Sequence, residues 1–111
     1  MIQKLTTDLI AQILTNDKFE SSKDFNNDKG QWVQFLMRSL NNPNVLMMGT
    51  EKEGKLLEFS VTIHHRDLCF LIYISDGALD DPDYKKVSFE WAKKFNCSDT
   101  NLKKFKTWDG E

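Results

Sequence analysis

Apolar and polar residues follow a strand pattern through residues 56–75, in the middle of the chain. Over residues 57–63 every second position is apolar, which is the period of a strand with one buried face and one wetter face. The apolar positions are Leu57, Phe59, Val61 and Ile63, and the polar positions are Glu58, Ser60, Thr62 and His64. Residues 68–74 then run without a charged residue, as is typical of a strand covered on both faces. We therefore predict a hairpin whose second strand is the centre of the sheet.

Two more strands are predicted before this hairpin. Residues 45–52 fit a strand that a turn at Glu53 and Gly54 joins to the hairpin. Residues 2–5 fit a short edge strand near the start of the chain. Three antiparallel strands therefore follow one another from residue 45 onward.

Two helices are predicted between residues 6 and 43, each from an apolar stripe at helical spacing. Thr6 or Thr7 suits the N-cap of the first helix, and Asn27 or Asp28 suits that of the second. The stripes are Leu9, Ile10, Ile13 and Leu14 in the first helix and Trp32, Val33, Leu36 and Leu40 in the second. The loop between them contains Phe19 and Phe25, which we expect to pin it to the domain.

The clearest helix begins near Asp83. Its apolar stripe recurs over three turns and consists of Tyr84, Val87, Ser88, Trp91, Ala92 and Phe95. Asp81 before Pro82 suits an N-cap with proline at the first helical position. Residues 101–108 are predicted to form a last strand beside residues 68–74. Trp32 and Trp91 lie on helical stripes and are interpreted as core residues.

These elements predict an α+β fold with a mainly antiparallel central sheet and helices on both faces. The strands at 45–52, 56–64 and 68–75 are expected to be neighbours in that order. The helix that starts near Asp83 is expected on one face of the sheet and the first two helices on the other. With 111 residues, of which 40% are hydrophobic and 29% charged, residues 1–111 are expected to form a single domain.

Charge and hydropathy narrow the function classes. The formal net charge is −2, which argues against a surface committed to nucleic acid or to an anionic membrane, because such binding needs a basic excess. Residues 68–74 are the longest apolar run and are far shorter than the roughly 20 residues of a membrane-spanning helix. We therefore expect no membrane partner.

The candidate metal and nucleophile residues have simpler interpretations. His64 and His65 are adjacent in a strand, so their side chains point to opposite faces, and Arg66 and Asp67 complete a polar turn. Cys69 lies inside an apolar strand, where a thiol has a raised pKa and is inert. We assign no metal site and no catalytic residue.

The order of strand, two helices, three antiparallel strands, helix and strand resembles the N-terminal and central part of the GNAT acetyltransferase superfamily. The best local piece is residues 68–108, which include the helical stretch Phe89-Glu90-Trp91-Ala92-Lys93-Lys94 and Asn96-Cys97. The resemblance implies a GNAT-like fold. It also implies that the loop after the second hairpin strand is the equivalent of the one that holds the coenzyme A pyrophosphate. The positions in this chain are Ile74, Ser75, Asp76, Gly77 and Ala78.

This loop departs from the family's pattern of a basic or amide side chain and two glycines. Residues 75–83 contain one glycine, no basic residue and four aspartates, and Pro82 lacks a backbone donor. An anion about 4 Å from a single carboxylate is disfavoured by roughly 1 to 4 kcal/mol, depending on the local dielectric. The chain also ends before the segment that often carries the family's tyrosine general acid. We therefore expect no cofactor, and a reduced, degenerate member of the superfamily.

The function we predict is a non-catalytic GNAT-like module that acts by contact with a protein partner or by self-association. The small size and the bias towards lysine and asparagine resemble reduced phage GNAT-like proteins, so we expect a small bacteriophage protein or virion component, located in the host cytoplasm or the virion. One alternative is an N-acetyltransferase that uses acetyl-CoA through an atypical loop at residues 74–78. The other is a small nucleic-acid binder, which the acidic net charge disfavours.

The partner surface is predicted on the last strand, residues 101–108. Strict alternation cannot bury all three of its large apolar residues, so at least one is expected to be an interface anchor. The expected anchors are Leu102, Phe105 and Trp108, with Lys103, Lys104 and Lys106 at the rim.

Overall fold

A computed structural model shows the arrangement of residues 1–96. The strands are β1 (Gln3–Lys4), β2 (Val45–Lys52), β3 (Lys55–His65) and β4 (Leu68–Ile74). The helices are α1 (Thr7–Thr15), α2 (Lys29–Arg38), α3 (Asp76–Leu79) and α4 (Pro82–Lys93), with a 3-10 turn at Lys23–Phe25. The strand predicted at residues 101–108 lies outside the described residues.

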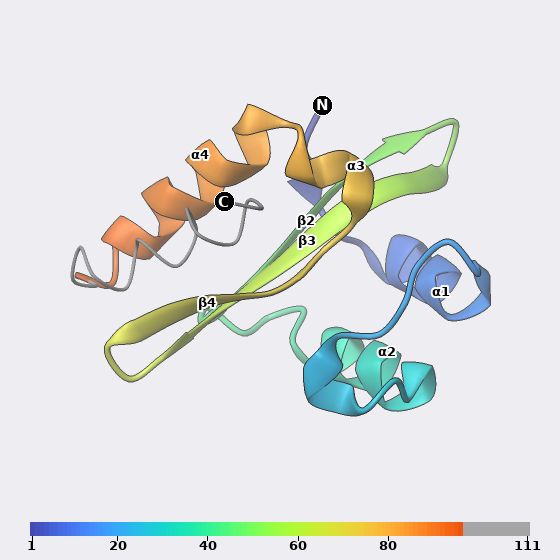
Figure 1. The fold of residues 1–111 in the computed structure, drawn as a ribbon, viewed down its shortest axis with the longest axis horizontal. Coiled ribbons are helices and arrows are strands. Elements are labelled where there is room, and N and C mark those ends of the chain that lie inside the picture. The colour runs from blue at the N-terminus through green and yellow to red at the C-terminus, as the bar shows by residue number, and fades with distance from the viewer. Residues whose placement is uncertain (97–111) are drawn as a thin grey trace.

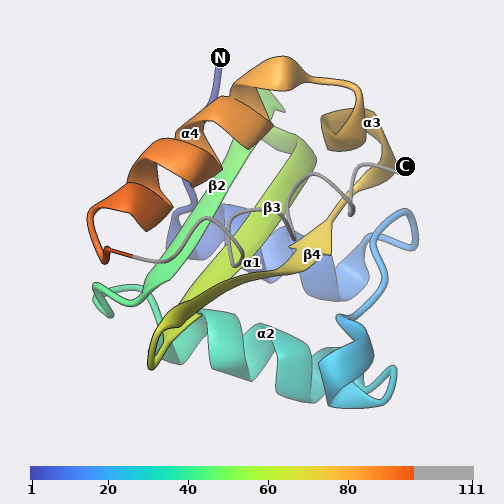
Figure 2. The same cartoon turned by 60° about the vertical axis from the view of Figure 1, so that its left-hand side comes forward.

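The sheet is antiparallel throughout these residues, in the order β1-β2-β3-β4. Helices α1 and α2 cover one face, and α3 and α4 cover the other (Figures 1 and 2). The predicted α+β class, the order of the three long strands and the placement of helices on both faces are therefore confirmed.

The local signals predicted from the sequence act as expected at the helix starts. The Thr6 hydroxyl accepts a hydrogen bond from the Leu9 amide, and the Asp28 carboxylate accepts one from the Gln31 amide. Asp81 caps α4 by accepting from the Asp83 amide, with Pro82 at the first helical position. The Glu53–Gly54 turn has positive φ at both residues, as a two-residue hairpin loop of this kind requires.

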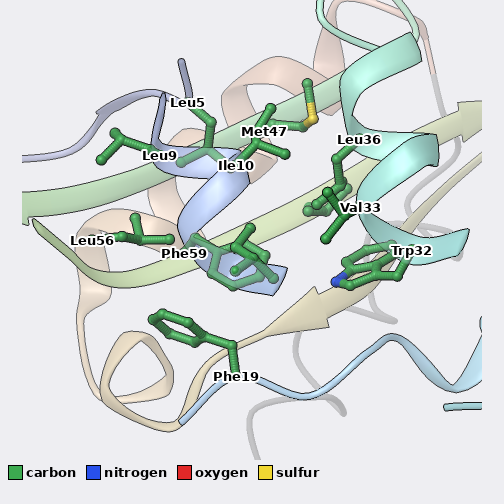
Figure 3. Packing of buried hydrophobic residues seen from close by; sticks show 12 residues of the cluster. Leu5, Leu9, Ile10, Phe19, Trp32, Val33, Leu36, Met47, Leu56 and Phe59 are labelled. Atoms are coloured by element: carbon green, nitrogen blue, oxygen red, sulfur yellow. The ribbon is translucent and has the colours of Figure 1, made fainter. Parts of the chain in front are cut away.

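The principal core lies between the sheet and helices α1 and α2. Phe59 points from β3 into this layer, and Phe19 packs edge-on against it with ring centroids 5.2 Å apart (Figure 3). Trp32 is fully buried, and Tyr73 lies within ring-contact distance of both Trp32 and Phe59. The prediction that Phe19 and Phe25 attach their loop to the domain is confirmed for both residues.

Two apolar positions were predicted wrongly. Leu57 was expected on the buried face of its strand, yet it is 42% exposed, whereas Leu56 is buried beside Phe59 in the principal core. The register of β2 and β3 shifts between Thr50 and Glu51, which leaves Leu57 as an extra residue, and a bulge of this kind reverses the alternation. Leu14, placed on the stripe of α1, is 49% exposed near the helix end.

Within residues 1–96, β2 and β3 are the interior strands of the sheet. The sequence prediction that one face of β3 is wetter was wrong. Ser60 and Thr62 are 1% and 0% exposed, so β3 is buried on both faces. Strand β4 is the outermost strand of this part of the sheet, and six of its seven residues are only partly buried. Its predicted central position depends on residues 101–108, which are outside the described part.

Candidate functional site

A groove of about 650 Å³ opens at the β1 edge of the sheet, between the two helical layers. We call it the β2-edge groove, because Val45, Leu46 and Met47 of β2 lie at its floor. Its lining residues come from β1, from the turn after α2, from β2 and from α4. They are Lys4, Leu5, Leu40, Asn41, Asn42, Pro43, Val45, Leu46, Met47, Val87, Glu90, Trp91 and Lys94.

The groove exists because β1 is much shorter than the strand it pairs with. Gln3 and Lys4 pair with Gly49 and Met48, and the Leu5 amide donates to the Met47 carbonyl at 3.2 Å. Thr6 then caps α1, so the chain leaves the sheet at this point. Within residues 1–96, the first residues of β2 therefore have no strand beside them on this side.

One side of helix α4 forms a wall of the groove. Tyr84, Ser88 and Ala92, spaced four residues apart, are buried against the sheet and α3. The groove wall consists of Val87, Glu90, Trp91 and Lys94, at the i, i+3, i+4, i+7 spacing of a single helix face. Trp91, interpreted from the sequence as a core residue, is only partly buried, so that interpretation was incomplete.

The rim of the groove is charged and its floor is apolar. Lys4 and Lys94 are exposed at the rim, and among residues 1–96 Glu90 is the only acidic lining residue. These three side chains together carry one net positive charge, whereas the chain as a whole carries a net charge of −2. The groove therefore favours an anionic group beside an apolar one.

The loop expected to correspond to an acyl-CoA site is folded tightly onto the sheet. Ser75 extends the ladder, since its amide donates to the Phe59 carbonyl at 3.0 Å and its hydroxyl accepts from the Phe59 amide at 3.0 Å. Ala78 is buried against Met48 and Tyr84, and its amide donates to the Ser75 carbonyl. Ile74 is partly buried at the end of β4, and Asp76 and Gly77 are exposed in α3.

The carboxylate of Glu58 lies directly against Gly77. A Cβ atom at position 77 would overlap Glu58 Oε2, so the absence of a side chain there gives the carboxylate its place. Asp76, Asp80, Asp81 and Asp83 lie on the same short segment. The surroundings of this loop therefore contain one more carboxylate, from β3, than the sequence of the loop itself shows.

Two tyrosines in the described chain are shifted toward their neutral form. Burial raises the pKa of Tyr84 to about 12, and the nearby charges of Glu58 and Asp81 act in the same direction. The Thr50 hydroxyl acts in the opposite direction and lowers the pKa of Tyr84, although Thr50 Oγ1 lacks a hydrogen bond of good geometry. The Tyr84 hydroxyl donates to the Glu58 carbonyl at 3.3 Å. Burial also raises the pKa of Tyr73.

A seam of hydroxyl groups lies on the α4 face of the sheet. Ser60 and Thr62 alternate with Phe59 and Val61 along β3 and so point away from the principal core. The oxygens Ser60 Oγ and Thr62 Oγ1 are fully buried and have no hydrogen-bond partner among the described residues. Ser88 of α4 is buried on the same side of the sheet. Unpaired buried polar groups are costly; within residues 1–96 this layer contains these two hydroxyls, and the layer beneath α1 and α2 contains one such group, Trp32 Nε1.

His64, next to the polar turn, and Cys69 both pack against other side chains of the domain. His64 stacks on Phe95 with ring centroids 4.0 Å apart, and its Nδ1 lies 3.1 Å from Asn44 Oδ1. Cys69 is fully buried, which confirms the prediction that it packs in the core. No cluster of three or more His, Cys, Asp or Glu side chains suited to a metal ion occurs within residues 1–96.

The predicted partner residues and the observed groove come from different parts of the chain. Leu102, Lys103, Lys104, Phe105, Lys106 and Trp108 all lie beyond residue 96, outside the described part. The groove was not predicted from the sequence, although one signal pointed to it. An edge strand of about four residues next to a strand of eight leaves part of the longer strand uncovered.

Comparisons with known proteins add no family to this geometry. No protein-family model, no curated protein and no solved structure matches the chain. None of the helices within residues 1–96 has the length and apolar character needed to cross a membrane.

Proposed function

We propose that this chain is a non-catalytic binding module that acts through contact with another protein or with a second copy of itself. The observation that carries the proposal is the β2-edge groove, which combines a strand end that is uncovered within residues 1–96 with a partly exposed tryptophan. Aromatic side chains at the centre of a concave, apolar surface are the usual anchors of protein contacts. Uncovered strand edges invite a further chain to pair with them.

The element order within residues 1–96 supports the proposal that the module is GNAT-like, since apart from the short helix α3 it follows the order on which that resemblance rests up to the last strand, which lies outside the described residues. A bacteriophage origin, with a place in the host cytoplasm or in a virion, remains a prediction from size and composition. The alternative of an acetyl-CoA-dependent N-acetyltransferase is disfavoured by the carboxylates around Gly77. Glu58 lies against the helical turn that would have to receive a pyrophosphate.

Acetyl-CoA is therefore expected not to bind. A thermal-shift titration up to millimolar acetyl-CoA should leave the Tm unchanged, with an active acetyltransferase as the positive control. A saturable rise in Tm that Gly77→Trp abolishes, in a variant that remains folded, would restore the enzymatic alternative and contradict the proposal.

A photoreactive amino acid in the groove tests the contact itself. We would place it at position 91 and, in a second preparation, at position 14, where Leu14 is exposed on α1 and does not line the groove. Each preparation is irradiated in the cells that naturally produce the chain. The proposal predicts a discrete protein adduct from position 91, absent from position 14; an adduct of twice the chain mass indicates self-association.

Equal labelling from both positions would show random collision, and no adduct from position 91 would show that the groove is not in contact with a protein. Either result contradicts the proposal. The control requires that both preparations unfold at the same temperature as the unlabelled chain.

A further inference from the structure

We infer that the β2-edge groove binds an extended peptide segment that carries an acidic side chain beside apolar ones. The inference rests on the proposed function and names the chemistry of the partner. Three features of the groove lead to it: the direction of the Val45 carbonyl of β2, the position of the groove between the two helical layers and the charges at the rim.

The backbone of β2 determines that the bound segment is extended. Met47 turns its carbonyl toward β1, where it accepts from Leu5. In an antiparallel strand, residues two apart turn their backbone groups to the same side, so Val45 also directs its carbonyl into the groove. The Val45 amide already donates to Asn42 at 3.1 Å. A segment aligned along β2 can therefore donate an amide to Val45 and continue the pairing that β1 leaves incomplete.

The walls of the groove select apolar side chains at alternate positions. Successive side chains of an extended segment point to opposite faces of the sheet. One set would meet Val87 and Trp91 on α4, and the other would meet Leu40 and Leu5 on the opposite side. The volume of about 650 Å³ falls within the range of roughly 300 to 1,000 Å³ found for pockets that enclose a ligand. A few residues of extended chain, rather than a whole helix, fit this space.

The rim selects an acidic residue. Lys4 on β1 and Lys94, the C-cap residue of α4, are both exposed and are both lining residues. Glu90 stands one turn before Lys94 on the same helix and offsets part of its charge, which leaves Lys4 as the less compensated cation. A carboxylate on the bound segment would complement both lysines, whereas a basic residue would be repelled by them.

The probe for this inference is an array of synthetic heptapeptides with alternating valine and threonine and with glutamate, glutamine or lysine at the ends. We expect the glutamate peptides to bind best, with an affinity that falls as salt is raised. Replacing Lys4→Glu and Lys94→Glu together should reverse the preference toward the lysine peptides. Each exposed charge pair contributes up to about a fivefold change in affinity. The matched control is Lys55→Glu, an exposed strand lysine that does not line the groove.

Methylation of single peptide nitrogens tests the backbone pairing independently of charge. Binding should be lost when alternate amides are methylated and retained when the intervening amides are methylated. Equal affinity for all end groups, no reversal by the double charge variant, or binding by helical peptides only would overturn the inference. If the array fails while the position 91 adduct forms, the protein contact stands and the extended acidic segment is rejected; if both fail, the proposed function is also rejected.

Discussion

The two faces of the central sheet are built from the same strands but differ in chemistry. The face under α1 and α2 carries Phe59 and Val61 and is closed by fully buried aromatic and aliphatic side chains. The face under α4 carries Ser60 and Thr62, whose buried hydroxyls are unpaired among the described residues. Its apolar clusters are small: one is centred on Met48, Ala78 and Tyr84, the other on Cys69 and Ala92.

This difference indicates a division of tasks within one small domain. A close-packed, largely apolar layer provides most of the burial free energy, since that term follows apolar area removed from water, although this layer also contains the buried Trp32 Nε1, which is unpaired among the described residues. Among residues 1–96 the α4 layer has the smaller apolar clusters, and one side of α4 lines the groove at the open edge of β2. Regions with fewer apolar contacts open more readily and more often carry binding sites. We therefore assign stability mainly to the α1/α2 face and propose the partner contact at the groove that α4 lines on one side.

Truncation of the main core residue should have the largest effect. Phe59→Ala removes a fully buried ring that contacts Phe19 and Tyr73, and it is expected to lower the free energy of unfolding by about 3 to 5 kcal/mol. Met48→Ala on the α4 face should cost less, near the lower end of about 2 to 5 kcal/mol. Chemical denaturation of both variants checks the comparison. A larger loss for Met48→Ala would contradict the division.

Close packing over β2 predicts a second, smaller loss. A Cβ atom at Gly49 would lie 2.7 Å from the Glu58 carbonyl oxygen and 2.9 Å from Leu5, so Gly49→Ala requires backbone movement. We expect a loss of about 1 to 3 kcal/mol. The control is Gly30→Ala in α2, where the nearest atom is 3.4 Å away and alanine favours the helix by about 0.5 to 1 kcal/mol. Similar midpoints for the two variants would show that the layer over Gly49 is loosely packed.

The decline in the free energy of unfolding at alkaline pH is a smaller effect, to which one tyrosine from each face contributes. Tyr73 packs in the principal core and Tyr84 beneath α4, and both have raised pKa values, that of Tyr84 reaching about 12. A phenol with a raised pKa in the folded state contributes stability below the unfolded pKa of about 10, and this contribution is lost as the pH rises toward 12. Tyr84→Phe should therefore flatten the decline in stability between pH 10 and 12. An unchanged decline would show that Tyr84 ionises as freely as in the unfolded chain.

Most of the fold follows from local signals, and the errors have physical causes. The apolar periods predicted the strand at Val45–Lys52 with its observed bounds. The capping preferences of the residue types predicted the helix starts, and the observed caps Thr6, Asp28 and Asp81 are among the predicted residues. The helix α3 was missed because its four residues have no apolar period, and its only buried residue is Ala78. A period also cannot reveal a bulge, which is why Leu57 was assigned to the wrong face.

The candidate site was less predictable than the fold. Its residues belong to four separate segments, and none has a sequence motif of its own. Trp91 had the spacing of a core residue, but burial depends on what packs against a helix face, and here that face lines the groove. Ser60 and Thr62 likewise had the pattern of a wet face, whereas both are buried on the side of the sheet that faces α4. Long-range packing decided each of these cases, and a single sequence does not encode it in a local pattern.

Two neighbouring residues of β3 test the difference between the faces most directly. Val61 and Thr62 are both fully buried and have side chains of similar shape, but they point to opposite sides of the sheet. Val61→Thr places an unpaired hydroxyl in the apolar layer and should lower the free energy of unfolding by about 1 to 3 kcal/mol. Thr62→Val removes an unpaired hydroxyl from the α4 layer and should raise that free energy by about 1 kcal/mol. Urea denaturation of both variants should therefore give changes of opposite sign, and destabilisation by Thr62→Val comparable to that by Val61→Thr would contradict the account.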